Sequence, residues 1–207
     1  MNSQNPNRIE IERVAECGVF RHLTTIPGIR HDLKYAGTDN FACVNLYGAH
    51  DCAWLHREAA DALERAAQFL ARHDASLHLR VLDALRPHRV QEAMWAHLKD
   101  TPLKIYLADP LRGSIHSYGM AIDVTIARRD GTWLDMGSGF DELAEVSHPE
   151  FEARFLSEGT LTQKHISHRQ LLRDTMAAGG FHGITTEWWH FDCGDRAHVR
   201  KTYLRVD

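Results

Sequence analysis

The chain has 207 residues, of which 43% are hydrophobic and 25% charged, and its formal net charge is −4. This composition is typical of a globular domain and excludes a disordered chain. Lys and Arg form no basic stripe, which argues against a nucleic-acid partner. No stretch approaches the roughly 18 apolar residues of a membrane span, so no membrane partner is expected.

The start of the chain and the cysteines indicate a cytoplasmic protein. Residues 1–14 (MNSQNPNRIEIERV) lack the basic start and apolar core of a secretory signal. The 4 cysteines are scattered without a CxxC pair, so we expect reduced thiols. No internal repeat or linker-like stretch divides the chain, which predicts one domain over residues 1–207. The oligomeric state is left open, and a homo-oligomer is compatible with the sequence.

Hydrophobic spacing predicts the elements of the first half. Apolar residues recur at helical spacing over 51–73, and 77–83 (LHLRVLD) alternates as a strand does. Pro87 fits the first turn of a second helix that continues to Leu98. Three polar residues of this region are expected to point outward: Gln91, Glu92 and Lys99.

The second half is predicted to add a central strand over 121–126 (AIDVTI) and a long helix over 161–178, ended by Gly179–Gly180. Residues 185–192 and 199–206 resemble final strands. Helices gather early and late around neighbouring strands. We therefore expect an α+β fold, with a central, mainly antiparallel sheet flanked by helices in a single compact domain.

The stretch SIHSYGMAIDVTI (114–126) contains a charged residue in apolar surroundings. His116 is flanked by serines, Gly119 permits a tight turn, and Asp123 lies between Ile122 and Val124. A buried carboxylate is costly without a partner. Either Asp123 faces the solvated side of an alternating strand, or a metal ion compensates its charge with a neutral imidazole beside it.

Two further stretches could contribute to a site. In TTEWWHFDC (185–193), Glu187 and His190 would lie on opposite faces of a flat strand, so a shared site requires a bulge or a strand end there. The alternative is an edge strand with an exposed Glu187. In DALRP (83–87), Arg86 precedes a proline, which favours extended backbone and a side chain over a pocket. Its alternative is a surface arginine paired with Asp83.

The remaining histidines are assigned no role. His165 and His168 share a helix face, but no acid or third ligand is coupled to them in the sequence. The others in unremarkable polar contexts are expected to be solvated: His22, His31, His73, His97, His148 and His198.

These stretches together resemble the D-alanyl-D-alanine dipeptidases, zinc enzymes associated with vancomycin resistance. The family patterns S-x-H-x-x-G-x-A-x-D, E-x-W-H and D-x-x-R-P are matched by SIHSYGMAID, EWWH and DALRP. The segments HDLKYAGTDNF (31–41) and LDMGSGFDE (134–142) also resemble family segments around the substrate pocket. Two departures, at Leu85 and Tyr118, concern pocket shape and not the reacting groups.

The resemblance implies a zinc dipeptidase that cleaves free D-alanyl-D-alanine. It implies that His116, Asp123 and His190 bind one Zn²⁺ and leave a fourth position for water. Glu187 is then the general base and Arg86 donates to the developing oxyanion. Trp188 and Trp189 would wall and support the metal site. Whether the role is antibiotic resistance or scavenging of peptidoglycan fragments is left open.

A free dipeptide has two charged ends, and the resemblance supplies candidates for both. Asp141 is the candidate for the substrate ammonium, with Tyr35 nearby, and Ser114 or Ser117 is the candidate for the carboxylate. Asp141 has an alternative role as the cap of the following DELAEV segment. The rival functions are a D,D-carboxypeptidase or peptidoglycan endopeptidase with the same zinc chemistry, and a zinc-binding module without catalysis.

Overall fold

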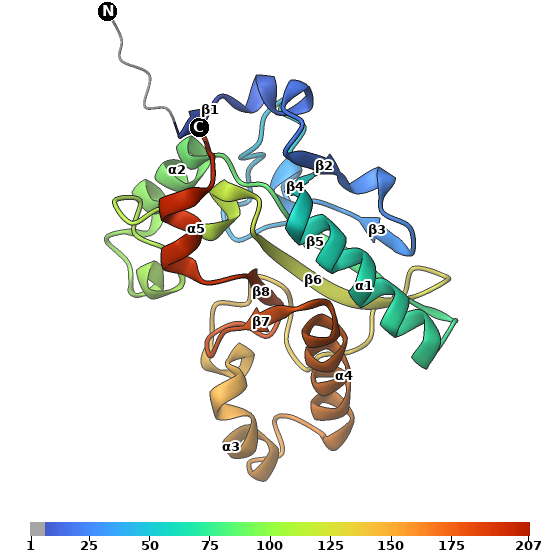
Figure 1. Ribbon diagram of the computed structural model, residues 1–207. Helices are drawn as coiled ribbons and strands as arrows, with labels where there is room; N and C mark the ends of the chain where they lie inside the picture. Colours follow the sequence, from blue (N-terminus) through green and yellow to red (C-terminus); the bar gives the residue numbers. More distant parts are fainter. Residues whose placement is uncertain (1–6) are drawn as a thin grey trace, which may run out of the picture.

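A five-stranded sheet with the order β3-β5-β6-β8-β7 forms the centre of the computed structural model, which describes residues 7–207. Only β3 and β5 are parallel, and the other neighbouring strands are antiparallel (Figure 1). The expected α+β fold with a mainly antiparallel sheet is therefore confirmed. The strands are β3 (Ile29–His31), β5 (Leu77–Asp83), β6 (Ala121–Arg128), β8 (His190–Cys193) and β7 (Phe181–Gly183).

Two long helices, α1 (Arg57–His73) and α4 (Gln163–Gly179), pack against each other and on the sheet (Figure 1). Their close approach depends on Gly179, because a Cβ at that position would lie 2.5 Å from the carbonyl oxygen of Ala62. Gly180 then ends α4 in the left-handed conformation, with φ of 102°. The expected glycine stop is confirmed, since a residue without a Cβ adopts this conformation at little cost.

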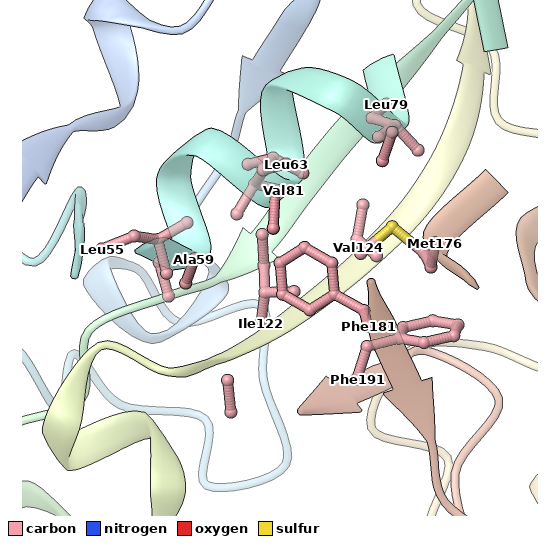
Figure 2. Packing of buried hydrophobic residues seen from close by; sticks show 14 of the residues in the cluster. Leu55, Ala59, Leu63, Leu79, Val81, Ile122, Val124, Met176, Phe181 and Phe191 are labelled. Carbon is pink, nitrogen blue, oxygen red and sulfur yellow. The ribbon is translucent and has the colours of Figure 1, made fainter. Parts of the chain in front are cut away.

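The main core lies between α1, α4 and the sheet. Leu63 of α1 faces Val81 of β5 and Ile122 of β6, while Met176 of α4 approaches the sheet from the side (Figure 2). All four side chains are fully buried. Strand β6 is buried along seven of its eight residues, because it is central in the sheet and covered on both faces. Asp123 in that strand therefore has no solvated face to point toward, unlike a residue of a strand with one exposed side.

Shorter elements surround this centre. Strand β1 (Arg8–Ile9) pairs in parallel with β9 (Arg205–Val206), which brings the two ends of the described chain together (Figure 1). Strand β2 (Phe20–His22) pairs antiparallel with β4 (Trp54–His56). The shorter α-helices are α2 (His88–Leu98), α3 (Glu152–Ser157) and α5 (Arg196–Thr202), and the 3₁₀ segments are η1 (Ile11–Glu16), η2 (Leu23–Thr25), η3 (Lys34–Ala36), η4 (Pro102–Tyr106), η5 (Ile115–Tyr118), η6 (Glu145–Ser147) and η7 (Pro149–Phe151).

The C-terminal region differs from its prediction. Residues 199–206 were expected to form a strand, but α5 occupies the region up to Thr202 and only β9 remains extended. The helix begins there because the side chain of Asp195 caps it and accepts a hydrogen bond from the backbone N–H of His198 at 2.8 Å. Likewise 185–189 forms no strand, and β8 begins only at His190.

Two predictions in the first half also need correction. The first long helix begins at Arg57 and not at Asp51, because β4 occupies the residues before it. Gln91 of α2 is fully buried, whereas Glu92 and Lys99 are exposed as expected. Its amide donates to the carbonyl oxygen of Ala108 at 2.9 Å, so a partner within the protein replaces water.

The state of the cysteines agrees with the sequence prediction. Each of the four cysteines is a free thiol, as expected. Across residues 7–207, no helix has the length and apolar character that crossing a bilayer requires.

Candidate active site

Three side chains from separate stretches converge at one end of the central strands. Asp123 of β6 and His190 of β8 are register partners across an antiparallel pair, and His116 lies on η5 just before β6. The chain passes from η5 into β6 through Gly119, whose φ is 64°. A Cβ there would lie 2.7 Å from the backbone nitrogen of His56, so only glycine fits this turn without a shift.

The facing atoms of these three side chains form a small triangle. Nε2 of His116 lies 3.2 Å from Nδ1 of His190 and 3.4 Å from Oδ1 of Asp123. Nδ1 of His190 lies 3.0 Å from the same carboxylate oxygen. A tetrahedral ion with metal–ligand distances of about 2.0–2.1 Å places its ligand atoms about 3.4 Å apart. Within residues 7–207 this is the only such group of three, and its dimensions fit a metal ion.

The outer nitrogens of both histidines support the same conclusion. Nδ1 of His116 lies 2.7 Å from the carbonyl oxygen of Ala84, and Nε2 of His190 lies 3.1 Å from Oδ1 of Asp192. Each outer nitrogen therefore donates its N–H, so that the inner nitrogen of each ring is the one that binds a metal ion once the ring is neutral. Asp192 was missed in the sequence, although residues two apart in a strand share a face and Asp192 follows His190 at that spacing.

The electrostatics of the triangle favour a cation. Burial alone would raise the pKa of Asp123, but His116 and His190 hold it well below its usual value. Burial would also lower the pKa of His190, yet Asp123 and Asp192 raise it to about 10. The protein without metal thus holds a proton between these carboxylates. A metal ion that binds there displaces the proton, as is usual for metal sites built from histidine.

Arg86 lies beside the triangle and is buried, so the alternative of a surface arginine is wrong. Its pairing with Asp83 is correct: Nε and Nη2 donate to Oδ2 of Asp83 at 3.0 and 2.7 Å. Nη1 donates to the side chain of Gln91 at 3.1 Å, and Nη2 lies 3.6 Å from Oδ2 of Asp123. The guanidinium is therefore held rigidly next to the candidate metal ligands.

Asp83 is the buried anchor of this arrangement. Its carboxylate accepts a hydrogen bond from the hydroxyl of Tyr47 as well as those from Arg86. The pairing of β5 with β6 shifts register between Val81 and Asp83, and such an irregularity redirects side chains at a strand end. Burial would lower the pKa of Arg86, but the charge of Asp83 raises it, so the guanidinium stays charged.

Asp141 and Tyr35 are in contact, as the sequence predicted. The carboxylate of Asp141 accepts hydrogen bonds from the hydroxyl of Tyr35 at 2.9 Å and from the backbone N–H of Phe41 at 3.4 Å. Burial raises the pKa of Asp141 to about 7, and the charge of Asp123 adds to this. The helix-cap alternative is wrong, because the next helical segment, η6, is preceded by Ala144 and has no side-chain cap.

Glu187 lines the same cavity as the metal triangle. It lies in the irregular stretch before β8, which begins at His190. Because Glu187 is outside the strand, it and His190 line the same cavity although they are three residues apart. Burial raises the pKa of Glu187 to about 7, although His190 acts in the opposite direction. The two tryptophans that follow are buried. Trp189 lines the cavity, and the indole N–H of Trp188 donates to Oγ of Ser138 at 3.0 Å.

The cavity has a volume of about 220 Å³. It brings together most of the residues predicted for the site, namely Tyr35, Arg86, Ser114, His116, Asp123, Asp141, Glu187 and His190. Ser117 is absent from its lining, since it is fully buried and its hydroxyl has no hydrogen-bond partner within the described chain. Of the two candidates for the substrate carboxylate, Ser114 or Ser117, only Ser114 lines the cavity.

The cavity also contains residues that sequence reasoning missed. Besides Asp192, these include Arg196 and Arg200 of α5 and the stretch 105–108. The two arginines are four residues apart, which puts them on one face of a helix, but the region was expected to be a strand. His148, which was expected to be solvated, is instead buried outside the cavity lining. Its Nε2 lies 2.8 Å from the hydroxyl of Tyr106.

Comparisons with known proteins agree with the geometry. A family model described as D-ala-D-ala dipeptidase matches residues 16–207. A D-alanyl-D-alanine dipeptidase of Escherichia coli (strain K12) is 38% identical over 166 residues, which cover 80% of this chain and 79% of that protein. One from Enterococcus faecium is 30% identical over 194 residues, with 84% and 90% covered.

Among solved structures, one titled "Structure of the LdcB LD-carboxypeptidase reveals the molecular basis of peptidoglycan recognition" matches with a TM-score of 0.48 and 17% identity, over 95% of this chain and 74% of that one. The family match spans nearly the whole chain and includes the three motifs that carried the resemblance in the sequence. This chain belongs to the D-ala-D-ala dipeptidase family of metallopeptidases.

Proposed function

We propose that this protein hydrolyses the free dipeptide D-alanyl-D-alanine to two molecules of D-alanine, with one zinc ion per chain. The observation that carries the proposal is the metal-sized triangle of His116, Asp123 and His190 at a small cavity that also contains Glu187, Arg86 and Asp141. The names of the relatives point to the same substrate.

Zinc is proposed because two imidazole nitrogens and one carboxylate oxygen are the ligand types of catalytic zinc sites. Both histidines have their outer nitrogens hydrogen-bonded, so they are oriented for binding. When bound, zinc supplies a Lewis acid and lowers the pKa of a coordinated water. The remaining chemistry is that of the protein's own side chains.

Glu187 is the proposed general base. Its carboxylate takes a proton from the attacking water and then delivers it to the leaving amine. Burial raises the pKa of Glu187 to about 7 in the protein without metal, which moves the group toward the range in which a carboxylate both accepts and releases a proton near neutral pH. Trp189 lines the cavity beside it and limits the access of further water.

Arg86 is the proposed donor to the carbonyl oxygen that becomes negative during the reaction. Its guanidinium is fixed by Asp83 and Gln91 before substrate arrives, so little reorganisation is needed. Removal of a single donor of this kind typically lowers turnover by about 10²-fold or more.

Asp141, with Tyr35, is proposed to bind the substrate ammonium, and Ser114 to contribute to the carboxylate end. The cavity of about 220 Å³ is smaller than the roughly 300–1,000 Å³ typical of pockets for drug-sized ligands. This size favours a dipeptide over the longer peptides that a D,D-carboxypeptidase or an endopeptidase accepts.

A substrate panel tests the proposal. Hydrolysis of D,D-, L,L- and L,D-dipeptides is compared with that of N-acylated tripeptides that end in D-alanyl-D-alanine, using zinc-loaded protein. We expect preferential cleavage of the free D,D-dipeptide. Preferred cleavage of the N-acylated tripeptides would instead support the carboxypeptidase function. A zinc-loaded protein that cleaves none of them would support the non-catalytic module.

A further inference from the structure

One guanidinium of the cavity lining has no carboxylate partner. Arg86 is paired with Asp83, and Arg196 donates to Oδ2 of Asp192 through Nε at 2.6 Å. Arg200 donates only to backbone carbonyl oxygens, through Nε to Gly113 at 3.1 Å and through Nη1 to Arg196 at 3.5 Å. In the part of the chain from residue 7 onward, no carboxylate oxygen forms an ion pair with Arg200.

The position of Arg200 is set by α5 and by the loop before η5. Arg196 and Arg200 are one helical turn apart, so both face the cavity. Val199 lies on another face of the helix and is buried, which anchors α5 to the protein. Gly113, with φ of 76°, directs its carbonyl oxygen toward Arg200. The guanidinium is therefore held at the backbone of the residue before Ser114, and both side chains line the cavity.

The surroundings of Arg200 are unfavourable for a cation until an anion arrives. Its side chain is partly buried, and its pKa is held below the usual value by that burial and by the positive charges of Arg112 and Arg196, although Asp192 acts in the opposite direction. A partly desolvated charge that forms no ion pair with a carboxylate costs free energy. An incoming carboxylate relieves this cost and forms a charge-assisted hydrogen bond, often with two parallel N–H donors.

We propose that Arg200 binds the terminal carboxylate of the substrate and is a specificity-determining residue of the cavity, with Ser114 beside it. The inference rests on the proposed function and deepens it. Asp141 takes the ammonium and Arg200 takes the carboxylate, so the cavity recognises both charged ends of a free dipeptide. A peptide that lacks either charge leaves one of these groups unpaired, which disfavours its binding.

The experiment compares D-alanyl-D-alanine with its C-terminal amide in zinc-loaded wild type and in R200Q. We expect R200Q to raise KM for the free acid by about ten- to hundredfold, the range of a charge-assisted contact. KM for the amide should stay the same, so the preference for the acid disappears. R200K should restore part of that preference, because it keeps the charge but not the planar donor pair.

R112Q is the matched control, since Arg112 is an exposed nearby cation that does not line the cavity. It should keep the preference of wild type for the acid. Zinc content and unfolding temperature are measured for every variant. If R200Q slows the acid and the amide equally, Arg200 only docks α5 onto Gly113 and the proposal is wrong. A wild type without preference for the acid contradicts it as well.

Binding to E187Q and to the double variant E187Q/R200Q, measured by calorimetry with the same two ligands, separates this inference from the proposed function. Binding of the dipeptide that weakens with R200Q supports the carboxylate role even if no cleavage is found. Binding that is independent of Arg200 contradicts this inference alone. Absence of dipeptide binding and of cleavage contradicts both.

Discussion

Asp192 holds the imidazole of His190 in one orientation, because its Oδ1 lies 3.1 Å from Nε2 of the ring. The other carboxylate oxygen accepts a hydrogen bond from Nε of Arg196 at 2.6 Å, so Asp192 is itself fixed. The result is a chain of contacts from α5 through β8 to the metal triangle. Nδ1 of His190 is left to face Asp123 at 3.0 Å.

Asp192→Ala should therefore weaken metal binding without removing a ligand. Loss of the hydrogen-bond partner of a ligating histidine typically lowers metal affinity by about 10–100-fold, because the ring loses its fixed tautomer and orientation. Competition with a chelator of known affinity measures the change. Asp174→Ala, which removes an exposed acid on α4, should leave the affinity unchanged. Equal affinities of Asp192→Ala and wild type would contradict the positioning role.

His190→Ala should remove stoichiometric zinc. The three proposed ligands come from separate segments, and two of them do not hold the ion tightly. Elemental analysis after dialysis checks this, with His73→Ala as the control because His73 is exposed at the end of α1. If His190→Ala still contained one zinc per chain, the ligand assignment would be wrong.

Glu187→Gln should keep zinc and fold while turnover of the dipeptide falls by about 10²- to 10⁴-fold, the usual contribution of a general base. Gln has nearly the same shape but cannot take a proton. Steady-state kinetics at saturating substrate, together with zinc analysis of the same preparation, separates loss of the base from loss of the metal. Near-normal turnover would move the base role elsewhere, and Asp141 would be the first residue to examine.

Asp141→Asn should change substrate selectivity more than folding. The amide cannot form an ion pair with the substrate ammonium, so KM for the free dipeptide should rise by about tenfold or more. The preference for the free over the N-acetylated dipeptide should shrink, because the blocked amine has no ion pair to lose. A variant with the wild-type preference and only lower stability would show that Asp141 serves the structure through Tyr35 and Phe41.

The same substitution should alter the pH dependence of stability in zinc-free protein. The pKa of Asp141 is raised from 3.8 to about 7, so the folded state binds the proton more tightly than the unfolded chain. This contribution is fully present below pH 3.8 and is lost as pH rises through about 7. Between pH 5 and 8, wild type should lose on the order of 2 kcal/mol of unfolding free energy more than Asp141→Asn. Urea unfolding at both pH values measures the difference. Equal losses of unfolding free energy in wild type and Asp141→Asn would contradict the raised pKa of Asp141.

Periodic patterns in the sequence were sufficient for the long elements. The apolar spacing that predicted α1 and the alternation that predicted β5 report which side of an element is buried, and the glycine pair that ends α4 marked its end. Asp123 within an apolar stretch was informative for the same reason, since a charge in the centre of a sheet requires a partner. The grouping of His116, Asp123 and His190 as metal ligands came from the resemblance of the motifs to the dipeptidase family.

Only the tertiary structure decided how other polar groups are used. Gln91 and Ser117 are both buried in the folded chain. The local sequence pattern did not show that Gln91 binds Arg86 or that Ser117 lies outside the cavity lining. Arg200 was hidden because a single cap at Asp195 turns an apparent strand into α5. The charge balance of a cavity depends on distances between segments, and these exist only after the chain has folded.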